Sequence, residues 1–216
     1  MPRPQDPQLE GKILDAAQTL WKKGGEKALT MRTVAKAAGT NTPAVYRRFR
    51  NREDILRALL QRIRSEFIGL IETAPTAHEA GECYMDFALS HPREYELFFQ
   101  YEYRLYYSRR SNYMGDKPGR PGMEVMKRKL AEELGGSADD RSELALALWM
   151  LVHGAAMLII GKTILREDVK AAREVFSDSV KVLLRAAQAG DSGRGLVPAV
   201  GATTEQLPPS HPEVGL

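Results

Sequence analysis

Residues 29–60, LTMRTVAKAAGTNTPAVYRRFRNREDILRALL, decide the fold of this 216-residue chain. Two short apolar segments, separated by a glycine, are followed by a longer amphipathic one. Thr30 and Asn51 are placed as N-caps, whose side-chain oxygens accept early backbone N–H groups. Thr42 is predicted to cap a further helix that starts at Pro43, because proline at the first helical position loses no hydrogen bond. A helix, a tight Gly-containing turn and a short helix together indicate a helix-turn-helix.

The second helix of such a pair enters the major groove of DNA with its N-terminal end. Small groups there let the backbone approach base edges, while Arg reads guanine and Tyr more often bonds a phosphate. Val45 and Phe49 lie four residues apart and are expected to face the core, with Arg48 pointing outward and Arg50 at the phosphate rim. The predicted DNA-contacting residues are Thr30, Arg32, Thr42, Pro43, Ala44, Tyr46, Arg47, Arg48 and Arg52.

The charge of the chain is distributed unevenly. Residues 1–64 hold 14 Lys and Arg against 6 Asp and Glu, a net +8, whereas residues 65–216 hold 17 against 22, a net −5. A basic N-terminal quarter favours contact with a polyanion. A solvated basic surface without a partner is the alternative on charge alone.

Helical periodicity continues through most of the remainder, and no segment predicts a strand. Pro75 ends the helix that follows Asn51, and Thr76-x-x-Glu79 forms a capping box for the next helix. The fold class predicted is all-α. The expected organisation is a flexible arm at 1–8, a helix-turn-helix domain at 9–53, a ligand-sensing and dimerisation domain at 54–189 and a disordered tail at 190–216. The helices are expected at about 9–23, 31–38, 43–49, 52–71, 76–90, 92–107, 123–134, 140–165 and 167–189.

Residues 9–60 resemble the DNA-binding region of the tetracycline-repressor (TetR) family. The resemblance lies in Thr30, in Val34-Ala35, in Ala38-Gly39, in Val45-Tyr46 with Phe49, and in the entry NREDIL into the next helix. Many members have His at the position of Arg48. The resemblance implies a homodimeric repressor that releases DNA when a small ligand binds.

Residues 144–161, LALALWMLVHGAAMLIIG, carry no charge and are nearly all apolar. Eighteen such residues stand at the lower limit for a membrane span. A buried central helix is the preferred interpretation, because the segment holds several small residues, lacks flanking aromatic belts and lies between polar segments.

The motif Trp149-x-x-x-His153-Gly154, together with HPREYELFF at 91–99, resembles a C-terminal domain of some TetR-like regulators. Aromatic residues concentrate between positions 84 and 113. Core packing explains most of them, and an apolar pocket for a small aromatic or amphipathic effector is the alternative for one or two. The residues predicted to line such a pocket are Phe87, Phe98, Tyr101, Trp149 and His153.

A two-fold operator requires a two-fold protein, so a homodimer is predicted. Small residues recur every seven positions on the apolar helix, and an apolar stripe runs along the last helix. These two helices could pack against the same two helices of a second copy and form a four-helix interface. The alternative is that both helices pack only within the core of their own chain. The predicted interface residues are Ala147, Gly154, Gly161, Phe176, Val180 and Leu183, with Val169 also on the stripe.

An enzyme and a pure protein-interaction module are the rival functions. The sequence contains no G-x-S-x-G, H-E-x-x-H or Gly-rich phosphate-binding pattern. His78, His91 and His211 form no ligand set with Cys83, the single cysteine, so we expect no metal and no cofactor. One cysteine and no secretory signal favour a cytoplasmic protein.

Overall fold

The computed structural model describes residues 8–101 and 121–190, and every regular element among them is helical. The predicted all-α class is therefore confirmed. The α-helices are α1 Leu9–Ala28, α2 Met31–Ala37, α3 Thr42–Tyr46, α4 Arg52–Thr73, α5 Ala77–Ser90, α6 Pro92–Glu96, α7 Pro121–Leu134, α8 Ser142–Ile160 and α9 Val169–Gly190. Short turns of other helix types are η1 Leu97–Tyr101, η3 Asp139–Arg141 and η4 Arg166–Asp168.

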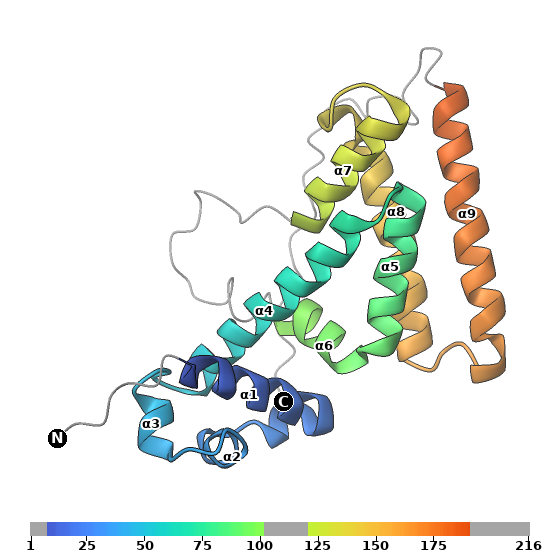
Figure 1. Cartoon of the computed structure of the whole chain (residues 1–216). Helices are drawn as coiled ribbons and strands as arrows, with labels where there is room; N and C mark the ends of the chain where they lie inside the picture. The colour runs from blue at the N-terminus through green and yellow to red at the C-terminus, as the bar shows by residue number, and fades with distance from the viewer. Residues whose placement is uncertain (1–7, 102–120, 191–216) are drawn as a thin grey trace, which may run out of the picture.

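The helices form two groups joined by α4 (Figure 1). The helices α1, α2 and α3 pack together at one end of the molecule. From there α4 runs into the second group, where it packs against α5 and α7. α8 packs on α5, α7 and α9, and α9 lies at the outer edge. α4 therefore belongs to both groups and connects them.

Several predicted boundaries differ from the structure. The predicted stop at Gly24 and Gly25 appears as a kink within α1: the backbone at Gly25 is not helical, with φ of +58°, and a further helical stretch continues to Ala28. The expected helix at 92–107 begins as α6 but continues as η1, a π-helical turn. The expected helix at 140–165 is shorter and ends at Ile160. Nearly all of the arm and of the tail, and the end of the expected helix at 92–107, lie outside the described residues.

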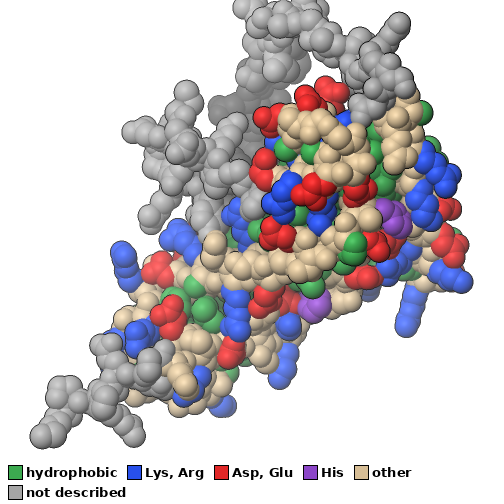
Figure 2. All heavy atoms as spheres, turned by 45° about the horizontal axis from the view of Figure 1, so that its top comes forward, with side chains coloured by type: hydrophobic (Ala, Val, Ile, Leu, Met, Phe, Trp, Pro, Cys, Tyr) green, Lys and Arg blue, Asp and Glu red, His purple; other side chains and the backbone are tan. Residues whose placement is uncertain are grey.

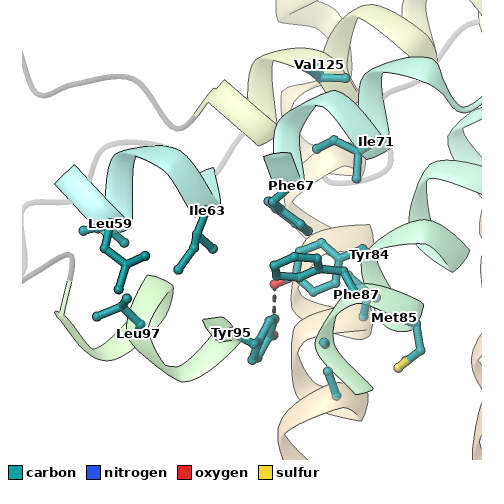
Figure 3. Close-up of a cluster of buried hydrophobic side chains, with 14 of the residues drawn as sticks. Leu59, Ile63, Phe67, Ile71, Tyr84, Met85, Phe87, Tyr95, Leu97 and Val125 are labelled. Carbon is teal, nitrogen blue, oxygen red and sulfur yellow. Dashed lines mark hydrogen bonds between the residues drawn. The ribbon is translucent and has the colours of Figure 1, made fainter. Parts of the chain in front are cut away.

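One continuous core runs along α4. Figure 3 shows Leu59, Ile63, Phe67 and Ile71 following one another on one side of this helix. All four are buried, at helical spacing, as an amphipathic pattern requires. Phe67 packs on aromatic rings of α5, with its centroid 5.0 Å from that of Tyr84 and 5.0 Å from that of Phe87. The same helix thus supports the small N-terminal group with one end and an aromatic cluster with the other.

Candidate functional site

The turn between α2 and α3 is built from short-range contacts. Gly39 has φ of +64°, a left-handed conformation that side chains rarely adopt. The N–H of Thr40 donates to the carbonyl of Ala35 at 2.9 Å, which closes the end of α2. Asn41, and not Thr42 as predicted, caps α3, because its Oδ1 accepts from the N–H of Ala44 at 2.9 Å. The helix-turn-helix geometry is therefore present, with the cap displaced by one residue.

α3 presents a polar face to solvent. The Tyr46 side chain is 52% exposed, and Pro43 and Arg47 are exposed as well, while Thr42 and Arg48 are half-buried. Val45 and Phe49 are buried as predicted. The prediction for Ala44 was wrong, because its side chain is only 4% exposed and packs in the core rather than toward a base. α3 therefore offers a phenol and guanidinium groups to a partner, but no methyl group from Ala44.

The start of α2 flanks this face. Thr30 and Thr33 cap each other: the Oγ1 of Thr30 accepts from the N–H of Thr33 at 3.1 Å, and the Oγ1 of Thr33 accepts from the N–H of Thr30 at 2.9 Å. Arg32 is exposed next to them. Thr30 and Arg32, the two predicted contacts, lie at the N-terminus of α2, where backbone N–H groups and the helix dipole favour an anion.

Arg52 has a partner that the sequence did not indicate. Its Nη2 lies 2.5 Å from the Oε1 of Glu26, so the start of α4 is tied to the end of α1. The predicted phosphate contact by Arg52 would have to compete with this ion pair. Arg50, by contrast, has an almost fully exposed side chain, with Asp54 at 4.0 Å.

A polar junction joins α1 to α6 and η1. The indole N–H of Trp21 donates to the carbonyl of Arg93 at 2.7 Å. The carboxylate of Glu94, only 2% exposed, accepts from Gln18 Nε2 at 2.7 Å and lies 3.3 Å from Lys22 Nζ. Buried polar groups of this kind need their partners, so separating α1 from α6 would leave them unsatisfied.

Tyr101 belongs to this junction and not to the predicted pocket lining. Its ring packs edge-on against Trp21, with centroids 5.3 Å apart, and its hydroxyl donates to Glu26. The carboxylate that holds Arg52 is therefore also held from η1. No sequence signal pointed to these contacts, because their partners are 26 to 76 positions apart in the chain.

The other predicted pocket residues lie near one another. Phe67 contacts both Phe87 and Phe98, with ring centroids 5.0 and 5.5 Å apart. Trp149 stacks on His153 at 5.3 Å. A separate hollow of about 320 Å³ opens on the surface between α1 and α2, and it is lined by Lys12, Asp15, Ala16, Thr19, Ala37 and Ala38. Its open form and its place between α1 and α2 do not fit the apolar cavity predicted among the later helices.

Two family models match the chain. Residues 13–59 match the model of bacterial regulatory proteins of the tetR family, and residues 77–183 match a tetracyclin repressor-like C-terminal domain. The chain belongs to the TetR family. It is therefore a DNA-binding transcriptional regulator, and typical members are repressors under ligand-responsive control. No curated protein matches the sequence.

Solved structures share the fold of this TetR-family chain. A protein of unknown function from Rhodococcus sp. RHA1 has a TM-score of 0.64 at 22% identity, over 86% of this chain and 98% of that one. A TetR-family transcriptional regulator from Streptomyces coelicolor has a TM-score of 0.56 at 17% identity, over 83% and 99%. A TetR variant from Acinetobacter baumannii AYE, in complex with minocycline, has a TM-score of 0.55 at 19% identity, over 83% and 96%.

The last two helices of this TetR-family chain leave apolar side chains in solvent. On α8, Met150 is 56% exposed, and on α9, Val175 is 66% exposed. The full set of large exposed hydrophobic residues on these helices is Leu146, Met150, Met157, Leu158, Val175 and Val182. Leu146, Met150 and Met157 recur at helical spacing along one side of α8, and exposed apolar side chains grouped in this way indicate an interaction surface.

The predicted dimer residues divide into two groups. Phe176 and Val180 are buried within the chain's own core, so they cannot form an exposed stripe, and this part of the prediction was wrong. The exposed apolar stripe of α9 instead follows Val175 and Val182, while Leu183 is half-buried. Burial of Phe176 has a simple cause: its ring lies 3.2 Å from the position of a Cβ on Gly81, against α5.

The small residues of α8 have different roles. Ala147 and Gly154 are half-buried on the side of the exposed methionines, and a Cβ on Gly154 would meet nothing within 4 Å among the described atoms. Gly161 lies just beyond the helix, where a Cβ would come within 2.9 Å of the Met157 carbonyl oxygen. Its lack of a side chain thus serves the turn at the end of α8. Gly154 leaves room for a neighbouring helix.

The segment Asp139–Ile160 is the one membrane-span candidate by length and composition within the described ranges, and 28% of its most apolar window is buried. Such a single helix is weak support for a span, and in this protein it packs on α5, α7 and α9. No group of three His, Cys, Asp or Glu residues suited to a metal ion occurs in the described part of the chain.

Proposed function

We propose that this TetR-family regulator is a homodimeric repressor that leaves a two-fold operator when a small apolar or aromatic molecule binds. Residues 9–53 act as the DNA-binding domain and residues 54–189 as the sensing and dimerisation domain. The DNA contacts come from Thr30, Arg32, Thr42, Pro43, Tyr46, Arg47 and Arg48, with Arg50 at the rim.

The observation that carries the proposal is the polar junction between the two domains. Trp21 and Gln18 of α1 are hydrogen-bonded to Arg93 and Glu94 of α6. A shift of α6 therefore either moves α1 with it or leaves the Glu94 carboxylate buried without a donor. A ligand that binds more tightly when α6 is shifted than when it is in its present position would therefore weaken DNA binding. The coupling is reciprocal, so DNA would weaken ligand binding by the same free energy.

Ligand control is also supported by a relative. The A. baumannii TetR variant was solved in complex with minocycline, a small molecule. For this chain we propose an apolar or aromatic effector, since aromatic rings of α4, α5 and η1 dominate the interior where α8 meets them.

The dimer is proposed to form through α8 and α9. The apolar faces around Met150 and Val182 would pack against the same faces of a second copy, with Gly154 allowing close helix approach. This packing accounts for the apolar character of α8 without a membrane. We propose a cytoplasmic location and no catalytic role.

The net positive charge of residues 1–64 supports the proposed binding to DNA. Figure 2 shows Lys and Arg side chains at the end of the molecule that holds α1 to α3, but also on the rest of the visible face. Acidic side chains lie among them in both regions. We therefore expect DNA affinity to come from the few cations near α2 and α3, with steep salt dependence from counterion release.

The experiment is selection of bound duplexes from a random DNA pool, followed by fluorescence anisotropy at several salt concentrations. We expect a consensus with two-fold symmetry and an affinity that falls as salt rises. An asymmetric consensus would exclude the dimeric mode, and a flat salt profile would exclude the assigned cationic contacts.

A further inference from the structure

Three polar atoms from three helices meet in the aromatic interior. The hydroxyl of Tyr95 in α6 lies 2.6 Å from Nδ1 of His153 in α8. The hydroxyl of Tyr84 in α5 lies 3.1 Å from the same nitrogen and 3.0 Å from the Tyr95 hydroxyl. Figure 3 shows the Tyr84 and Tyr95 hydroxyls directed at each other. Because both tyrosines are buried, each hydroxyl proton requires an acceptor within this group.

Counting the protons assigns the tautomer of His153. If Nδ1 is an acceptor, one tyrosine donates to the other and the second donates to Nδ1, so both hydroxyl protons are bonded. If Nδ1 carried the proton, one hydroxyl proton would have no acceptor in the triad. Burial lowers the pKa of His153 and, as the main cause, raises the pKa of Tyr84 and of Tyr95, so all three groups are neutral near pH 7. The imidazole proton therefore resides on Nε2.

The Nε2–H of His153 is a donor without a partner among the described residues. The hydrogen bonds of His153 to Tyr84 and Tyr95 both involve Nδ1, and the fully buried unpaired side-chain atoms among the described residues are His91 Nδ1 and Glu94 Oε2. The Nε2 atom thus retains accessible surface. Its surroundings are aromatic: Trp149 stacks on the imidazole at 5.3 Å, and the ring of Phe99 is 4.5 Å away.

Phe99 is placed there by η1. This segment is a π-helical turn, a form that is rare and often occurs at functional sites. It directs Phe98 toward Phe67 and Phe99 toward His153, with the two phenyl centroids 4.7 Å apart. The same turn ends at Tyr101, which contacts Trp21 and Glu26 of α1. A molecule that displaces Phe99 therefore acts on the segment that touches the DNA-binding domain.

We infer that the Nε2–H of His153, between Phe99 and Trp149, is the recognition point for an uncharged oxygen acceptor on an aromatic effector, with an aryl ketone as the simplest member of that class. This inference rests on the proposed ligand response. A neutral acceptor is favoured over an anion because, among the described residues, the ring and hydrogen-bond contacts of His153 come from Tyr84, Tyr95, Phe99 and Trp149, none of which carries a positive charge.

The first test needs no ligand. Long-range ¹H–¹⁵N NMR of the whole, uniformly labelled protein reports which imidazole nitrogen is protonated, and His153→Phe assigns the signal. We expect the neutral tautomer protonated on Nε2 at pH 7. A proton on Nδ1, or a charged ring, would overturn the inference.

The second test uses two isosteric probes, acetophenone and α-methylstyrene, in which a carbonyl oxygen replaces a methylene group. Binding is followed by chemical-shift titration of the tryptophan indole signals. We expect acetophenone to bind about two- to tenfold more tightly, the range of one net hydrogen bond. The preference should disappear in His153→Phe, which keeps a ring against Trp149, and persist in the control His78→Phe.

Equal affinities in the wild-type protein, or binding of neither probe, would overturn the inference. The DNA assay then separates it from the proposed function. If acetophenone binds with the expected His153-dependent preference but never changes DNA affinity, the site stands and the proposed effector response fails. If DNA is released equally well by both probes, the response stands and the role of His153 fails.

Discussion

α3 and α8 both present side chains to solvent, but of opposite chemistry. α3 exposes Tyr46 and Arg47, while α8 exposes Met150 and Leu158. The first set can donate hydrogen bonds and carry charge, which suits phosphates and base edges. The second set gains only by leaving water, which suits another apolar surface. The difference is what the proposed function requires of one chain, a polar face for DNA and an apolar face for a second copy.

The two helices also differ in how they are held. α3 is five residues long and depends on local contacts, the Asn41 cap and the Gly39 turn. α8 has nineteen residues and packs on three other helices, so its position depends on distant parts of the chain. Substitutions in α3 should therefore weaken DNA binding and leave the dimer intact. Substitutions on the outer face of α8 should weaken the dimer.

The largest effect is expected for Gly154→Leu. A Cβ at this position meets nothing within 4 Å in the single chain, so the fold of each protomer should persist. In a two-fold interface the change occurs twice, and each overpacked contact costs about 1–3 kcal/mol. Analytical ultracentrifugation should show dissociation at concentrations where the wild-type protein is dimeric.

Gly11→Leu is the matched control, since Gly11 also has open space around it but lies on α1. It should leave sedimentation unchanged. A dimer of unaltered strength in Gly154→Leu would remove α8 from the proposed interface and end the contrast between the two helices.

The next effect is on operator affinity. Tyr46→Ala removes the most exposed aromatic side chain of α3 and should weaken binding by about 1–3 kcal/mol per half-site. Fluorescence anisotropy on the selected operator measures the loss. Arg166→Ala in η4, an exposed cation of the other domain, should have no comparable effect. Equal losses in the two variants would point to general electrostatics and not to α3.

A smaller effect concerns stability within the DNA-binding group. Thr30→Ala removes the cap of α2 and should lower the free energy of unfolding by about 0.5–2 kcal/mol. Urea denaturation at one protein concentration measures it, because dimer stability varies with concentration. Thr19→Ala removes the same hydroxyl and methyl groups at an exposed position inside α1 but no cap, so it should not lower the free energy of unfolding. Comparison of the two variants distinguishes the loss of a helix cap from the loss of a threonine side chain in general.

The smallest effect is expected from pH. Burial lowers the pKa of His153 in the folded state from its ordinary value of 6.5, so the unfolded chain binds more protons as pH falls through that value. The stability contributed by keeping the ring neutral is fully present above pH 6.5 and is lost as pH falls toward the folded-state pKa. Denaturation between pH 8 and 5 should therefore show a shallower decline in His153→Phe than in the wild-type protein. An unchanged decline would assign the pH dependence to other groups.

The sequence by itself determined the all-α class, the helix-turn-helix and most caps. Thr30, Asn51 and Thr76 each accept the predicted N–H from a residue three positions on, because capping and amphipathic spacing are contacts between near neighbours. Val45 and Phe49 were placed in the core for the same reason. The misplaced cap at Thr42 shows the limit of such reasoning: two adjacent residues, Asn41 and Thr42, could both have capped α3.

Only the tertiary structure decided which apolar residues of α9 are covered and which long-range polar pairs form. Phe176 and Val175 are equally apolar, yet one packs against α5 and the other lies in solvent, since the direction of approach of α5 is set by the whole bundle. Glu94 with Gln18, and His153 with Tyr84 and Tyr95, are likewise pairs made by folding. Periodicity specifies a face within one helix, but which neighbour covers that face depends on contacts between residues far apart in the chain.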